Sequence, residues 1–196
     1  MRILNAVLLV VCSATALHAQ SFEAGTSVAA SAWSEFDGAD KGIGGRFGWK
    51  PIPLVGVEAD LTWYPSDFVA GRVPFSRQRI EGVFGATVGP ELTRLRPFAK
   101  AAAGFLKVSP TSGAFACIAI FPPPLACLLV GGDTLPVFEM GGGVTFTTTS
   151  RTFLRADLGY RFLKYPGPTF DSDFQVRDEG WWAGAPRCSF GAGIRF

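Results

Sequence analysis

The sequence predicts an all-β fold, an eight-stranded antiparallel up-and-down β-barrel, on three observations. Segments in which apolar and polar residues alternate recur along the chain, and a period of two residues is that of a β-strand. The connections between these segments alternate between short and long. The sequence closes on one more alternating segment, Cys188 to Phe196, which ends in an aromatic residue.

The first four segments are residues 22–33, 43–50, 55–63 and 79–88. The third is the clearest, because an apolar residue stands at every odd position from Val55 to Trp63. In each segment the opposite face carries charged residues, hydroxyls or glycine. The apolar faces are Phe22, Ala24, Val28, Ala30 and Ala32; Ile43, Gly45, Phe47 and Trp49; Val55, Val57, Ala59, Leu61 and Trp63; and Ile80, Phe84, Ala86 and Val88.

The last four segments are residues 97–107, 138–146, 154–162 and 188–196. Ala and Gly dominate the first of these, so its two faces are ambiguous, and Lys100 is assigned to the inner one. The apolar faces of the other three are Phe138, Met140, Val144 and Phe146; Leu154, Ala156, Leu158, Tyr160 and Phe162; and Phe190, Ala192, Ile194 and Phe196.

Composition agrees with a barrel whose wall is apolar on one side only. Apolar residues make up 48% of the chain and charged residues 17%, below the usual quarter for a soluble domain. After the N-terminal region no apolar run reaches the roughly 20 residues of a membrane helix. The net charge of +2 comes without a basic stripe, which argues against a nucleic-acid partner.

Residues 1–19 have the pattern of a secretory signal peptide, with Arg2 before an apolar stretch and a cleavage site after Ala19. A cut after Ala16 is the alternative. Residues 20–196 are then a single barrel domain. His18 is the only histidine of the sequence, so the mature chain is expected to have none.

The connections indicate a membrane barrel and its orientation. Residues 51–54, 89–95 and 148–151 are the short connections, and residues 34–42, 65–76, 109–133 and 164–187 are the long ones. Barrels of the bacterial outer membrane have short periplasmic turns and long extracellular loops. The alternation therefore predicts a transmembrane barrel with both termini in the periplasm of a Gram-negative cell.

Three stretches resemble strands of a known family. They are Arg96-Pro97-Phe98, the run from Leu154 to Phe162, and the closing run from Gly191 to Phe196. They are similar to strands of the eight-stranded outer-membrane β-barrels, the superfamily of the OmpA transmembrane domain, OmpX, OmpW and opacity-type surface antigens. The resemblance implies that Phe196, Ile194 and Phe190 form the signal that the barrel-assembly machinery reads. It also implies contact with outer-membrane lipid and lipopolysaccharide.

The charged residues on the inner faces are the main candidate site. Basic and acidic side chains are nearly balanced, and an unpaired charge in a narrow lumen is costly, so a salt-bridge network is expected to fill the interior. A path for protons or ions is the alternative, and a catalytic carboxylate pair at Glu58 and Asp60 is a further one. The inward charges are Glu23, Arg46, Lys50, Glu58, Asp60, Arg79, Glu81, Lys100, Glu139, Arg155, Asp157, Arg161 and Arg195.

The long connections offer a second candidate site. Cys117 and Cys127 bracket an apolar stretch in a compartment where nearby thiols usually pair, and Cys188 is left over. The apolar stretch either folds over the barrel mouth as a lid or meets a partner, which is an extracellular protein or an apolar ligand. The residues of this contact surface are Ile118, Ile120, Phe121, Leu125, Trp181 and Trp182.

These observations favour a non-enzymatic outer-membrane protein with a structural or surface-contact role. Without histidine the mature chain lacks the base that activates a serine nucleophile and the usual zinc ligand, so neither catalysis, a metal nor a cofactor is expected. The alternatives are an OmpW-like barrel that passes small apolar compounds, a narrow ion pore, and a secreted lipocalin-like barrel that binds a ligand on an apolar inner face.

Overall fold

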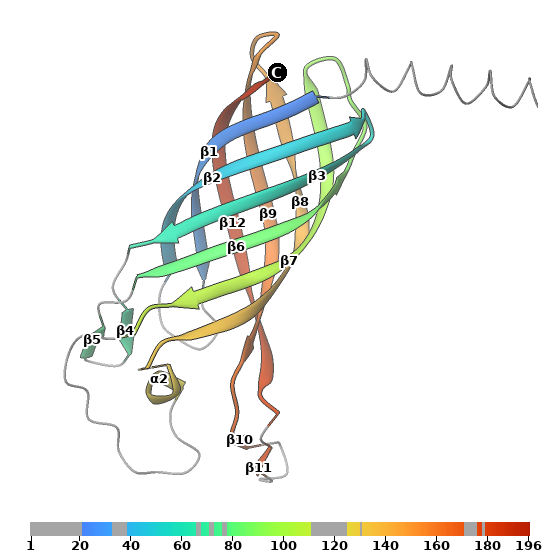
Figure 1. Ribbon diagram of the computed structural model, residues 1–196. Helices are drawn as coiled ribbons and strands as arrows, with labels where there is room; N and C mark the ends of the chain where they lie inside the picture. Colours follow the sequence, from blue (N-terminus) through green and yellow to red (C-terminus); the bar gives the residue numbers. More distant parts are fainter. Residues whose placement is uncertain are drawn as a thin grey trace, which may run out of the picture.

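The computed structural model describes residues 21–32, 39–65, 68–70, 73–75, 78–110, 125–129, 131–170, 176–177 and 179–196. In this part of the chain eight long strands form a closed, antiparallel barrel, which confirms the predicted fold class (Figure 1). The wall strands follow one another in chain order. They are β1 (Ser21–Ala32), β2 (Ala39–Ile52), β3 (Val55–Tyr64), β6 (Arg79–Val88), β7 (Leu95–Val108), β8 (Asp133–Thr147), β9 (Thr152–Tyr165) and β12 (Trp181–Arg195). The predicted signal peptide lies outside the described residues.

The first and last strands close the barrel. β1 pairs with β12 in a register that sets Glu23 opposite Arg195. Beyond this pair, the backbone N–H of Phe22 donates to the carbonyl of Phe196, and the N–H of Phe196 donates back, both at 2.9 Å. The ring of Phe22 stacks on the rings of Phe47 and Phe196, with centroids 6.0 and 6.2 Å apart. The final residue therefore belongs to the closing seam.

The short connections are tight turns, and they lie at the same end of the barrel as the C-terminus (Figure 1). Only Pro53 and Leu54 separate β2 from β3. In the turn between β8 and β9, the Thr149 hydroxyl accepts hydrogen bonds from the backbone N–H groups of Arg151 and Thr152, at 3.3 and 3.1 Å. A threonine side chain that binds nearby backbone stabilises such a turn.

The opposite end carries the small elements of the long connections (Figure 1). Two short hairpins lie there, β4 (Phe68–Ala70) with β5 (Val73–Phe75) and β10 (Thr169–Phe170) with β11 (Val176–Arg177). A single helical turn, α2 (Leu125–Leu128), precedes β8. No helix among the described residues is long and apolar enough to cross a membrane.

The strands extend further toward the long-loop end than the sequence predicts. The predicted loop 164–187 is wrong at both ends, because β9 runs to Tyr165 and β12 begins at Trp181. The predicted loop 34–42 is likewise too long, because β2 begins at Ala39. The predicted loop 109–133 also overlaps a strand, because β8 begins at Asp133. The reason lies in the residues of these extensions. Leu135 and Val137 face inward beside the outward Phe138, so both faces are apolar and the alternation disappears.

The outer wall is apolar and the inner wall is polar over most of its height. Leu158, Phe84 and Phe190 are 70%, 64% and 54% exposed, whereas Glu58, Asp60 and Glu81 on the inner face are buried. This sidedness is the reverse of the one that the lipocalin-like alternative requires, because that alternative needs a charged surface around an apolar interior.

Candidate functional site: the charged lumen

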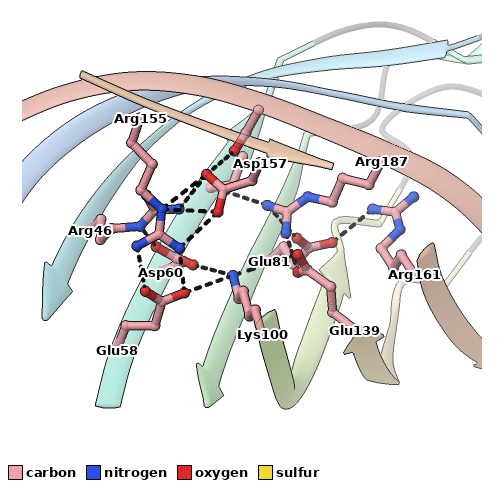
Figure 2. Close-up of polar contacts among 12 residues, drawn as sticks. Arg46, Glu58, Asp60, Glu81, Lys100, Glu139, Arg155, Asp157, Arg161 and Arg187 are labelled. Carbon is pink, nitrogen blue, oxygen red and sulfur yellow. Dashed lines mark hydrogen bonds and ion pairs between the residues drawn. The ribbon is translucent and has the colours of Figure 1, made fainter. Parts of the chain in front are cut away.

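The strand phase places every predicted lumen charge on the inner wall. β3 contributes Glu58 and Asp60, and β9 contributes Arg155, Asp157 and Arg161, always an even number of residues apart and so on one face. Ten side chains in the middle of the lumen are called the charged layer below. They are Arg46, Glu58, Asp60, Glu81, Lys100, Glu139, Arg155, Asp157, Arg161 and Arg187 (Figure 2).

Asp60 and Lys100 lie at the centre of the charged layer. The Asp60 carboxylate accepts a hydrogen bond from Arg46 Nε at 2.7 Å and another from Lys100 Nζ at 2.6 Å. Lys100 Nζ also lies 3.2 Å from Glu58 and 3.5 Å from Glu139. Lys100 thus neutralises carboxylates from two other strands, β3 and β8.

Arg155 crosses the barrel from β9 to β3, the strand on the opposite wall. Its guanidinium donates to both oxygens of Glu58, at 2.7 and 3.0 Å, in the paired geometry that suits arginine and a carboxylate. The same guanidinium binds Asp157 at 2.7 Å and lies 4.0 Å above the Phe98 ring. These contacts tie opposite sides of the cylinder together.

Arg187 makes a second crossing, from β12 to β6. Its Nη2 lies 3.1 Å from Glu81 and its Nη1 donates a short hydrogen bond to Glu139. Glu81 also accepts from Arg161 at 2.7 Å (Figure 2). Arg187 was not among the predicted lumen charges, because residues 164–187 were expected to form a loop. Its distance of eight residues from the inward Arg195 would have revealed it, since an even spacing keeps the same face.

Above the charged layer, toward the long loops, the lumen is filled by apolar side chains. This apolar cap consists of Tyr64, Leu106, Val108, Leu129, Leu135, Val137, Leu163 and Tyr165. Leu129, directly after α2, is 2% exposed and packs among these side chains. Arg79 binds Asp40 at 2.5 Å near this level, and Asp40 is another inward residue that lies in a predicted loop, residues 34–42.

The lower mouth, at the short turns, has its own group of charges. Glu23 accepts a short hydrogen bond from Lys50, and Arg195 Nη2 lies 2.8 Å from the same carboxylate. Arg195 also reaches Glu91 in the turn between β6 and β7, at 3.1 Å. Arg96 on β7 is buried at this level too and was not among the predicted inward charges.

Most of these charges are satisfied by partners from other strands. Removing one partner of a buried pair leaves the other charge unpaired in a dry interior, which typically costs about 3–5 kcal/mol. Both carboxylates of the suggested catalytic pair, Glu58 and Asp60, are held by cations. Among the described residues, no group of three or more His, Cys, Asp or Glu side chains is arranged to hold a metal ion.

Solved structures show what this architecture is similar to. No protein-family model and no curated protein sequence matches the chain. OprG, an outer-membrane protein of Pseudomonas aeruginosa, matches with a TM-score of 0.54 and 12% identity over 91% of this chain and 96% of that one. Ail, the attachment invasion locus protein of Yersinia pestis, in complex with the heparin analogue sucrose octasulfate, gives a TM-score of 0.52 and 14% identity over 90% and 97%. Neisserial surface protein A gives 0.51 and 16% over 90% and 95%.

The chain has the fold of the eight-stranded outer-membrane β-barrels. At these identities the likeness concerns the fold alone. The closing strand and residues 154–162 predicted a resemblance to these barrels, and this resemblance is confirmed for the fold.

The second candidate site is only partly described. Within the outer-membrane barrel fold, Trp181 and Trp182 lie in β12 rather than in a loop, which corrects their assignment. Trp181 packs on Tyr165 with ring centroids 5.4 Å apart, beside the apolar cap, and Trp182 is 54% exposed. Leu125 lies in α2. Ile118, Ile120 and Phe121 lie outside the described residues.

The cysteines too are only partly within the described residues. Cys117 lies outside the described residues, so its pairing with Cys127 stays a prediction. Cys188 carries a free thiol and is exposed on the outer wall of β12, opposite Ala30 of β1 and Leu158 of β9. It therefore sits in the apolar face that the alternation defines.

Proposed function

We propose that the chain is a non-enzymatic integral protein of the Gram-negative outer membrane, with a filled lumen and a long-loop end that contacts partners outside the cell. The observation that carries this proposal is the sidedness of the barrel. Apolar side chains cover its outer wall, while ion pairs and the apolar cap occupy its interior.

The outer wall supports the membrane setting. Its exposed apolar side chains come from every wall strand, and a continuous apolar surface of this kind is rare on a soluble protein. A closed barrel satisfies all backbone groups between its strands, as hydrocarbon requires. Apolar hollows of about 670–680 Å³ lie on this outer wall, for example the one between Val28, Ile43 and Leu61. Acyl chains are the natural occupants of such hollows.

The lumen supports a role without conduction. Arg155 and Arg187 each cross to the opposite wall, and the apolar cap lies above them. An ion would have to displace these pairs and then pass the cap. An OmpW-like path for small apolar compounds or a narrow ion pore is the alternative, and bilayer conductance with an uptake assay separates it from the proposed role.

The long-loop end is the proposed contact region. Two hairpins and α2 gather there, at the end away from the C-terminus (Figure 1). Exposed Trp182 lies directly opposite Lys164 on the outer wall. Aromatic rings and lysines at this level suit the phosphate region of lipopolysaccharide. An extracellular protein or an apolar ligand is the further proposed partner. The barrel-assembly machinery is the proposed reader of Phe190, Ile194 and Phe196.

Cell fractionation combined with surface labelling tests the proposal. The protein with its own leader is expressed in a Gram-negative host, and a tag is inserted after Ser109 or, as the control, after Thr148. The account predicts recovery in the outer-membrane fraction and antibody binding to intact cells only for the tag after Ser109. Recovery from the periplasm or the medium, or surface exposure of the tag after Thr148, would contradict it.

A further inference from the structure

Arg96 stands apart from the other cations of the lumen. Among the described residues, the other lumen cations each form an ion pair with a carboxylate, whereas Arg96 forms none. These paired cations are Arg46, Lys50, Arg79, Lys100, Arg155, Arg161, Arg187 and Arg195. Arg96 is 5% exposed, and its Nε and Nη2 donate no hydrogen bond. A buried guanidinium without a counter-charge is costly, which raises the question of what neutralises it.

The carboxylates near Arg96 are already engaged. Glu23 is bound by both Lys50 and Arg195, and Glu91 is bound by Arg195. Arg96 is attracted by these two carboxylates and repelled by Arg195 and Arg155. The lower mouth therefore holds more positive than negative charge, with Lys50 and Arg96 close enough to repel each other.

We propose that the lower mouth of the lumen binds one phosphate-type oxyanion through Arg96, with Lys50 as the second cation. The planar fork of arginine matches the oxygens of such an anion, and lysine acts beside it as a point charge. Thr145 lies opposite Arg96 on β8 and is buried with it, which adds a hydroxyl at the same level. Arg195 and Glu91 at this mouth are 22% and 44% exposed, so the end of the lumen that holds Arg96 borders solvent.

Two sources supply this chemistry. One is free inorganic phosphate. The other is the head group of a phospholipid at the barrel rim, and this second source rests on the proposed membrane setting. The test uses the purified, full barrel in a maltoside detergent and follows thermal unfolding. Inorganic phosphate and short-chain phosphatidylglycerol are added in separate arms, each against sodium chloride of equal ionic strength.

A bound anion stabilises the folded state in a saturable way. The wild type is expected to show a saturable rise of the unfolding midpoint, and the Arg96→Gln variant is expected to lose it. The matched control is Arg94→Gln in the same turn region, whose side chain is exposed, and it should keep the full shift. Without phosphate, Arg96→Gln should unfold at the wild-type temperature or above, because it removes an unpaired charge.

Equal shifts in the wild type and Arg96→Gln, or no saturable shift in either arm, would overturn the proposal. A shift with phosphatidylglycerol alone identifies the head group as the source, and a shift with inorganic phosphate identifies the free ion. If Arg96→Gln does not fold, Arg96→Lys replaces it, and a dissociation constant at least threefold weaker than that of the wild type is then expected. An unchanged constant would contradict the fork geometry. The inorganic phosphate arm needs no membrane, so its outcome is separate from that of the fractionation experiment.

Discussion

The charged layer and the apolar cap fill the same cylinder in two different ways. Each guanidinium of the charged layer has a fixed direction and partners on other strands, as Arg187 shows with Glu81 and Glu139. The apolar cap holds side chains such as Leu106 and Leu163 by packing, which has no direction and depends on volume. The difference implies that the charged layer fixes which strands face each other, whereas the cap tolerates exchange among residues of similar size.

Removal of Arg187 should have the largest effect. The Arg187→Met variant leaves Glu81 and Glu139 with one cation fewer in a buried setting, so unfolding free energy should fall by about 3–5 kcal/mol. Urea unfolding of the barrel in lipid vesicles, followed by tryptophan fluorescence, measures it. Arg94→Met is the control, because Arg94 is exposed. A loss below 1 kcal/mol, within the ordinary range of a surface pair, would mean that Arg187 is not part of a buried network.

Truncation in the apolar cap comes next. Leu106 is fully buried, so Leu106→Ala should destabilise the barrel by about 2–5 kcal/mol through the cavity it creates. Leu106→Met keeps the volume and should cost less than about 1.5 kcal/mol. The same urea titration compares the two variants. If Leu106→Met proved as damaging as Leu106→Ala, packing volume would not be what holds the cap.

Deletion of Phe196 should have a smaller effect on stability and a visible one on assembly. It removes two backbone hydrogen bonds to Phe22 and one ring contact, which together are worth about 1–3 kcal/mol. The proposed assembly role further predicts less protein in the outer membrane of expressing cells. Phe84→Leu, an exchange on the outer wall of β6 away from the closing seam, is the control. Normal outer-membrane levels of the deletion variant would count against the role of the closing residue.

The smallest effect is expected for Glu91, which is partly exposed. Its pair with Arg195 is screened by solvent, so Glu91→Gln should change stability by only about 0–1 kcal/mol, and salt should reduce that further. Glu58→Gln provides the buried counterpart, and its effect should persist at high salt. Equal salt dependence of the two variants would mean that ion pairs at the lower mouth and in the charged layer are screened to the same extent.

Much of the fold follows from the sequence, because alternation and loop length are local properties. The inward phase of Glu58, Asp60, Arg155 and Asp157 is read from neighbours within the same strand. The pairs are not local. The contact between Arg155 and Glu58 depends on the order and the stagger of the strands around the cylinder. These cannot be predicted from any single segment.

Arg187 and Asp40 were missed for the same reason. Arg187 and Asp40 lie in strand extensions at the long-loop end, where the apolar cap makes both faces of some strands apolar and the period of two is lost. Arg187 could still have been found by continuing the inward face of the closing strand from Arg195. The hairpins of the long connections gave no comparable signal, since each of their strands has only two or three residues.

Cys188 offers the most direct test of the central claim, that the apolar face of the alternation meets lipid. It is a free thiol on the outer wall, so an environment-sensitive fluorophore is attached to it in proteoliposomes, with Cys117 and Cys127 replaced by serine. The control places the fluorophore at Thr149 in the turn, through Thr149→Cys with Cys188→Ser. The account predicts blue-shifted emission at position 188, quenched by spin-labelled lipid and not by iodide, and the opposite at position 149. Water-like emission quenched by iodide at position 188 would contradict it.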